Sequence, residues 1–304
     1  LSIVVHALGV GPWRLCWALA LAAAPLTLFL QPVRSTLAFG QINVVMMALV
    51  VADCLLAAPR RPRGVLVGLA AAVKLTPMAF VLFFLVRGDR RAAGNAVTAF
   101  AGATLVGFVL APGGSWRYWS GDVFKLREGA PWFPTNQSIL GVLSRLGWAE
   151  RGHGGLVWLI VAAAVGALTV VAMRRSLTAG CVPWALTCNA IGALLVAPIA
   201  WTHHWVWMVP AIAILALRGW QARSVLLLAL AGAVCLAFVL PFPWWMPARR
   251  AWSSWQEVAG NTEVYCGLLL LAVTACVPAF RRALAAGPEG GRRTPSQSFG
   301  PAGP

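Results

Sequence analysis

Charged residues are scarce in this chain, and acidic residues are the scarcest of them. Only 11% of the 304 residues are charged, and 8 acids stand against 24 bases, for a formal net charge of +16. Soluble domains carry about 25% charged residues and about 45 to 50% apolar ones, whereas 60% of this chain is apolar and its mean hydropathy is +0.78. An ordinary soluble enzyme is therefore excluded. The composition predicts an all-α fold, a polytopic transmembrane helical bundle.

The sequence also lacks the short motifs of nucleotide and hydrolase chemistry. It contains no P-loop, no GxGxxG after a strand, no DxD, no HExxH and no GxSxG, so nucleotide-driven chemistry is disfavoured. The seven cysteines include no CxxC pair and no metal-ligand spacing, which indicates small core residues. We expect no metal and no cofactor.

The basic residues are almost all arginine and follow the apolar blocks. They occur in pairs and triplets between those blocks, which is typical of cytoplasmic loops in membrane proteins. Their position argues against nucleic acid as a partner and for the lipid bilayer.

Both ends of the chain carry a prediction. The chain opens at Leu1 without the features of a signal peptide, and we expect it to be an N-terminally truncated piece. The segment 287–304 is rich in Gly, Pro and Ser, which predicts a disordered cytoplasmic tail behind a membrane core over 1–286.

Apolar windows of spanning length predict eight membrane crossings. They are Leu15–Leu30, Ile42–Ala58, Gly94–Ala111, Gly155–Met173, Val182–Ala200, Trp205–Leu217, Ser224–Leu240 and Glu263–Phe280.

A ninth block, Gly64–Val86, is interrupted by Lys74 and by the step from Thr76 to Pro77. Arginines flank it on both sides, so both of its ends belong inside. It cannot then cross once, and we predict a re-entrant helix pair that turns near Lys74. Irregular backbone at membrane depth requires a cavity or a protein environment.

The outer face then collects four segments with most of the unusual polar residues and many of the 16 tryptophans. They are Gln31–Gln41, Pro112–Gly154, Trp201–His204 and Pro241–Asn261. The tryptophans fit an interfacial aromatic belt or platforms for sugar rings, and both can hold for different residues.

Lys74 is the first candidate for a functional residue, because an ionisable group at membrane depth costs at least about 2.5 kcal/mol. At the tip of the re-entrant pair it would offer a compact positive charge to a phosphate. The alternative is a lysine that snorkels from a helix end.

Amide side chains supply further candidates. Gln41 and Asn43 stand in FGQIN at the outer end of a span, as ligands or as a helix cap. Asn136 and Gln137 stand in PWFPTNQS, as hydroxyl-binding groups or as the cap of the next span.

His203 and His204 lie in PIAWTHHWVW. Adjacent positions on a helix diverge, so the pair does not match a metal site. We expect one imidazole to face the cavity, where it can bind a phosphate or a hydroxyl and change charge near neutral pH, and the other to face the bilayer interface. A structural interfacial pair is the alternative.

Four motifs in this order, FGQIN, GLAAAVKLTP, TNQS and APIAWTHHWVW, resemble glycosyltransferase family 87. The resemblance runs from Leu15 to about Phe280 and implies a C-type glycosyltransferase-like fold. It implies a polyprenol-phosphate-mannose-dependent α-(1,2)-mannosyltransferase at the outer face of the plasma membrane. No residue here matches the family's general-base Asp, which leaves the catalytic base unknown, and Ala200 stands where we expect Ser.

The resemblance further implies an inverting transfer from polyprenyl-phosphate-mannose to a glycolipid or polysaccharide acceptor, without a cofactor. Lys74 and one or both of His203 and His204 would stabilise the leaving phosphate. The alternative function is a multispanning transporter or flippase for a lipid-linked or small anionic substrate, because broken helices are also typical of transporters. No internal repeat is visible in support of it.

Overall fold

The computed structural model describes residues 1–56, 62–123, 131–148 and 153–285. The predicted tail 287–304 lies outside the described residues, as do part of the arginine-rich flank before Gly64 and parts of the predicted outer segment Pro112–Gly154. All regular elements of the described part are helical, in agreement with the predicted fold class.

The first half of the chain contributes short helices and one long one. In chain order they are α1 (Ser2–Ala7), α2 (Trp13–Thr27), α3 (Gln31–Ala38), α4 (Asn43–Leu55), α5 (Val65–Val73), the 3-10 helix η1 (Thr76–Phe80), α6 (Val81–Arg87), α7 (Arg90–Leu110), α8 (Pro112–Arg117) and the π-turn η2 (Tyr118–Asp122).

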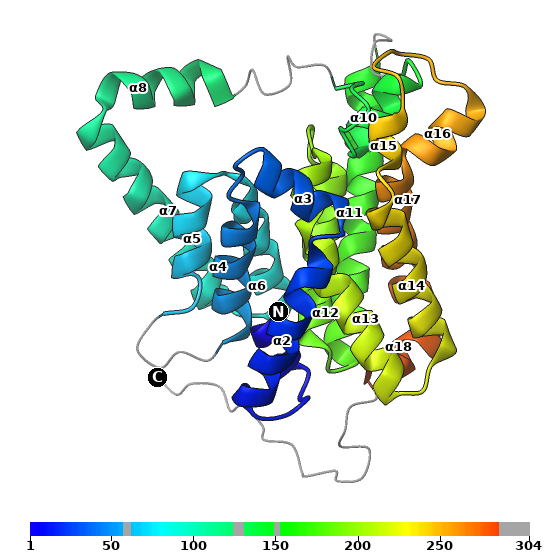
Figure 1. The fold of residues 1–304 in the computed structure, drawn as a ribbon. Helices are drawn as coiled ribbons and strands as arrows, with labels where there is room; N and C mark the ends of the chain where they lie inside the picture. Colours follow the sequence, from blue (N-terminus) through cyan, green and yellow to red (C-terminus); the bar gives the residue numbers. More distant parts are fainter. Residues whose placement is uncertain (57–61, 124–130, 149–152, 286–304) are drawn as a thin grey trace.

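The second half supplies most of the core. Its elements are α10 (Ile139–Arg145), α11 (Gly154–Thr178), α12 (Val182–Val196), the 3-10 helix η3 (Thr202–Trp207), α13 (Met208–Gln221), α14 (Val225–Val239), α15 (Phe242–Trp245), α16 (Ser254–Gly260), α17 (Thr262–Cys276) and α18 (Pro278–Ala285). In Figure 1, the end of α7 next to α8 leans away from the other helices, and α8 lies across that end.

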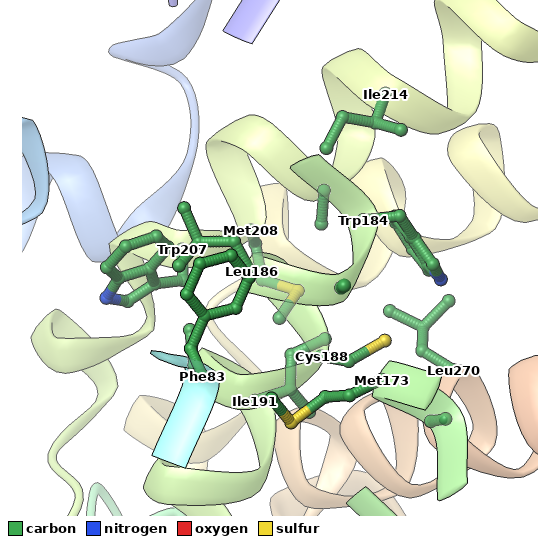
Figure 2. Packing of buried hydrophobic residues seen from close by; sticks show 14 of the residues in the cluster. Phe83, Met173, Trp184, Leu186, Cys188, Ile191, Trp207, Met208, Ile214 and Leu270 are labelled. Atoms are coloured by element: carbon green, nitrogen blue, oxygen red, sulfur yellow. The ribbon is translucent and has the colours of Figure 1, made fainter. Parts of the chain in front are cut away.

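Helix α12 is the centre of the bundle. Eleven of its 15 residues are buried, and the side chains of Trp184, Cys188 and Ile191 pack against residues from neighbouring helices, among them Met173 of α11 and Leu270 of α17 (Figure 2). The indole N–H of Trp184 donates to Thr274 Oγ1 at 3.0 Å, which satisfies its one polar atom inside the core.

Fewer helices have spanning length than the sequence predicts. Within the described residues, three are long and apolar enough to cross a membrane: α7, α11 and the segment Val225–Trp245. Two bent pairs raise this to five if each counts as one span: α2 with α3, bent by 79°, and α16 with α17, bent by 65°.

The prediction of eight crossings is therefore too high by this measure. The expected spans at 42–58 and 182–200 are helices of only 13 and 15 residues. An apolar run of this length is more typical of a core helix than of a membrane span. For α12 the reason is visible, because its side chains face other helices on nearly all sides.

The block 64–86 turns back on itself, as predicted for a re-entrant pair. The Arg63 guanidinium, just before the block, pairs with Asp89, just after it, at 3.2 Å, so the two ends of the block meet. Arg87 at the end of α6 donates to the carbonyl of Cys54, at the end of α4. The middle of the block instead reaches Asn43, the first residue of α4, which lies about 16 Å from Cys54 along that helix.

Glycine allows this unit to pack tightly on α7. Gly64 has a φ of +98°, and a Cβ there would lie 2.0 Å from the carbonyl oxygen of Ala92. A Cβ at Gly68 would lie 2.2 Å from the carbonyl oxygen of Ala96. Both positions require close approach of two backbones, which fixes α5 against α7 and hence sets the level of the break after Val73.

Candidate functional site

Lys74 lies where the helix of the re-entrant pair breaks. It follows α5 in an extended conformation, with φ −146° and ψ 121°, and its side chain is half-buried. The ammonium donates to Asn43 Oδ1 at 2.8 Å and lies 3.3 Å from His204 Nε2. Lys74 thus connects its own segment to two others, those of Asn43 and His204. The alternative of a snorkelling lysine does not describe these contacts.

Asn43 connects the lysine to the histidine segment. Its amide nitrogen donates to the carbonyl of His203 at 2.8 Å, and Thr36 Oγ1 donates to the same carbonyl at 2.9 Å. Asn43 makes no side-chain cap on α4, whose N-cap is Ile42. We call Lys74, Asn43, Thr36, His203 and His204 the lysine cluster.

Both imidazoles of the cluster are neutral near pH 7. Burial, and then the Lys74 charge, lowers the pKa of His204 to about 2 and that of His203 to about 4; η3, which carries them, lies outside the candidate spans. An ammonium group only donates hydrogen bonds, so Nε2 of His204 accepts and its proton sits on Nδ1. The expected change of charge near neutral pH is therefore not supported.

An open pocket of about 470 Å³ adjoins the lysine cluster at His203. The lining residues are Phe39, Phe133, Thr135, Trp201, His203 and Trp244. Each of the four segments predicted for the outer face supplies at least one of them. We call this the aromatic pocket, because four of its six residues are Phe or Trp.

The two histidines diverge, but neither is placed away from the site. Their rings are 4.6 Å apart between centroids and 84° apart in plane. His204 faces Lys74, while the ring of His203, one of the residues that line the aromatic pocket, meets Phe39 edge-on at 5.6 Å. That one ring faces the bilayer interface stays a prediction; the structure places the pair near the start of a 3-10 helix, with His204 beside Lys74 and His203 beside Phe39.

Asn136 and Gln137 are fully buried and act as tethers in the fold. Asn136 Oδ1 accepts from the backbone N–H of Ala200 at 2.9 Å, and Gln137 Nε2 donates to the carbonyl of Gly260 at 2.7 Å. The helix cap that follows is made by Ser138, whose hydroxyl accepts from Gly141 N–H. Neither amide lines the aromatic pocket.

Gln41 is exposed and does not join the cluster through any contact found in the described residues. Its backbone N–H donates to the carbonyl of Thr36 at 2.8 Å. FGQIN thus contributes its asparagine and its phenylalanine to the site, while its glutamine closes the turn after α3.

Sequence reasoning missed Thr36, Gln31 and Thr202. The Gln31 amide donates to Thr202 Oγ1 at 3.1 Å across 171 residues of sequence, and both side chains are buried. A weak signal was present, since Gln31 and Thr36 are polar residues in a short segment between two apolar blocks. Their partners were not visible, because the sequence does not show which loops meet.

No acidic residue lies in the lysine cluster or lines the aromatic pocket, within the described part of the chain. Asp53 is at the far end of α4 and accepts from Val67 N–H at 2.9 Å, and Asp89 pairs with Arg63. Among the described residues, no three His, Cys, Asp or Glu side chains group as metal ligands. A metal-free reaction stays a prediction.

The apolar helices and the polar cluster at a helix break define a multi-pass membrane protein with a site built from loops far apart in sequence. The model of one family, glycosyltransferase family 87, matches residues 1–200. The chain belongs to this family.

Curated relatives agree with this assignment. The chain is 43% identical over 268 residues to the polyprenol-phosphate-mannose-dependent alpha-(1-2)-phosphatidylinositol mannoside mannosyltransferase of Mycobacterium tuberculosis (86% of this chain, 61% of the relative). It is 39% identical over 281 residues to a protein of the same name from Mycolicibacterium smegmatis (88% and 63%). A pentamannoside mannosyltransferase of M. tuberculosis is 38% identical over 193 residues (61% and 42%).

The chain thus spans less than two thirds of the length of these relatives. No solved structure matches it significantly, so the likeness to the C-type glycosyltransferase fold stays a prediction.

Proposed function

We propose that this chain forms the membrane core of an inverting α-(1,2)-mannosyltransferase. The donor is mannose on a polyprenyl phosphate, and the acceptor is a membrane mannoside of the kind in the relatives' names. The reaction takes place at the extracytoplasmic face of the plasma membrane. Family membership favours transfer over the alternative of a transporter or flippase.

The observation that carries this proposal is the state of Lys74. Its ammonium is half-buried and has two neutral partners, Asn43 and His204, and no carboxylate lies within ion-pair distance of it among the described residues. A positive charge that is partly removed from water favours an anion beside it. The phosphate of a lipid-linked sugar supplies that anion.

The chemistry follows from a good leaving group. A hydroxyl oxygen of the acceptor attacks the anomeric carbon, the bond from that carbon to the phosphate oxygen breaks, and β configuration becomes α. The negative charge that grows on the departing phosphate is stabilised by Lys74, an electrostatic contribution that is commonly the largest in such reactions. The proton of the acceptor hydroxyl passes to a base. Among the described residues, no Asp or Glu lies beside Lys74 to serve as this base.

Transfer can be tested directly with the full-length protein in detergent micelles. We expect it to convert labelled polyprenyl-phosphate-mannose and a phosphatidylinositol mannoside into a product with a new α-(1,2) bond. Chelator should leave the rate unchanged, because no ligand set for a metal is grouped in the described residues. Absence of transfer, or loss of transfer with EDTA and recovery with a divalent ion, would refute the donor chemistry or the metal-free mechanism, respectively.

The orientation is tested by labelling single cysteines in a full-length protein whose own cysteines have been replaced. A cysteine at Pro62 or Arg90, at the two ends of the re-entrant block, should react with an impermeant reagent only from inside. A cysteine at Trp255, in α16, should react from outside. Labelling of the first two positions from opposite sides would contradict the re-entrant geometry.

A further inference from the structure

The aromatic pocket and the lysine cluster are two compartments that meet at one residue. The backbone carbonyl of His203 belongs to the cluster, where it accepts from Asn43 and Thr36. Its ring lies against Phe39, and both residues line the pocket. A group held at Lys74 and a group held in the pocket would thus lie on two sides of the same residue.

The lining of the pocket suits a neutral ligand. No Lys, Arg, Asp or Glu is among its lining residues, and His203 is neutral because burial lowers its pKa to about 4. Four of its six lining residues are Phe or Trp, and Thr135 and His203 are the two polar residues of the lining. A pyranose ring has this character, since its C–H face is apolar and its rim carries hydroxyl groups.

Trp244 is the wall that is best prepared for such a ring. Its indole N–H donates to the buried Thr202 Oγ1 at 3.3 Å, and the same oxygen accepts from Gln31 at 3.1 Å. Its plane lies at 21° to that of Phe39, with ring centroids 5.9 Å apart. These contacts fix the direction of the indole, yet 44% of the residue remains exposed.

The neighbouring Trp245 shows that interfacial placement alone does not explain Trp244. Both belong to the four-residue helix α15 and both are exposed. Trp245 packs edge-on against Phe242 at 5.2 Å and does not line the pocket. Trp245 fits the predicted interfacial belt, whereas Trp244 is turned into the site by its bond to Thr202.

We propose that the aromatic pocket binds the terminal sugar of the acceptor, with Trp244 as the stacking platform that determines its affinity. This inference rests on the proposed function, in which the donor phosphate is bound at Lys74. The acceptor sugar in the pocket and the donor at Lys74 then meet beside His203. Their reacting atoms must come within about 3 to 3.5 Å of each other for transfer. The pocket is open, as 52% of Phe39 is exposed.

The test compares Trp244→Ala, Trp244→Phe and Trp245→Ala in the full-length protein, with phosphatidylinositol mannoside as the acceptor and polyprenyl-phosphate-mannose as the donor. We expect Trp244→Ala to raise the acceptor KM by about tenfold, with the donor KM changed by less than about twofold. Trp244→Phe keeps an aromatic face and should stay within about threefold of the wild type. Trp245→Ala should leave both constants unchanged.

Three results would overturn this assignment while transfer by the wild type still supports the proposed function. Equal acceptor constants for the two alanine variants would place both tryptophans in the interfacial belt. A rise in the donor KM with an unchanged acceptor KM would give the pocket to the donor's sugar or its lipid chain. An equal loss with Trp244→Phe would assign the indole N–H, rather than the aromatic face, as the important group.

Discussion

Replacement of Lys74 by methionine should reduce kcat/KM for mannosyl transfer roughly 30- to 1,000-fold in the full-length protein, which corresponds to a loss of about 2 to 4 kcal/mol of transition-state stabilisation. The variant keeps a side chain of similar length but removes the charge that faces the leaving phosphate. Losses of this order follow removal of one preorganised charge-stabilising group. The rates are measured with labelled polyprenyl-phosphate-mannose under initial-rate conditions.

Arg63→Met is the matched control, because Arg63 is a cation of the same re-entrant unit at its other end. It pairs with Asp89 at 3.2 Å and is not part of the lysine cluster, so its loss should change kcat/KM by less than about threefold. His204→Ala should lower the rate through Lys74, whose ammonium it orients. In a double variant the two losses should not add. Wild-type turnover by a folded Lys74→Met protein would remove Lys74 from the reaction.

The fold was predictable where a local pattern decides it. Arginines on both flanks of 64–86, together with Lys74 in the middle, were sufficient to predict the re-entrant pair. The number of spans was not predictable, because a helix buried in protein and a helix in lipid have the same apolar composition. The 15-residue α12 illustrates this, because residues on nearly all of its sides are buried in the protein core.

The site was predictable in part for a similar reason. Lys74 and the histidine pair stood out because polar residues in apolar surroundings need a partner, but the sequence could not name the partner. The hydrogen bonds from Asn43 to His203 and from Gln31 to Thr202 join segments 160 and 171 residues apart. Asn136 shows the converse, because this amide in a predicted loop was expected to bind a hydroxyl or to cap the next span, and it is instead buried as a tether.

The buried Arg145 should be a strong determinant of stability. It is 1% exposed, and its guanidinium donates to the carbonyls of Phe133 and Asn136 at 3.0 and 3.1 Å, and to Asn261 Oδ1. Burial lowers its pKa to about 10, so it is charged at neutral pH. It thereby ties the loop of the aromatic pocket to α16 and α17.

Arg145→Met should lower the free energy of unfolding by at least about 2 kcal/mol, because the buried carbonyl of Asn136 and Asn261 Oδ1 both lose their donor, and each unsatisfied group costs about 1 to 3 kcal/mol. The thermal midpoint of the purified protein in detergent should fall by at least about 5 °C.

Arg250→Met is the matched control for that experiment. Arg145 lies over the ring of Trp252 at 4.7 Å and Arg250 over that of Trp132 at 5.7 Å, so both variants remove an arginine from an indole face. Arg250 is exposed, and an exposed contact of this kind contributes about 0.5 to 1 kcal/mol. If the two variants unfold at the same temperature, the hydrogen bonds from Arg145 to the carbonyls contribute no stability beyond that of its contact with the Trp252 ring. A selective loss with Arg145→Met instead identifies the hydrogen bonds as the interaction that holds the pocket loop in place.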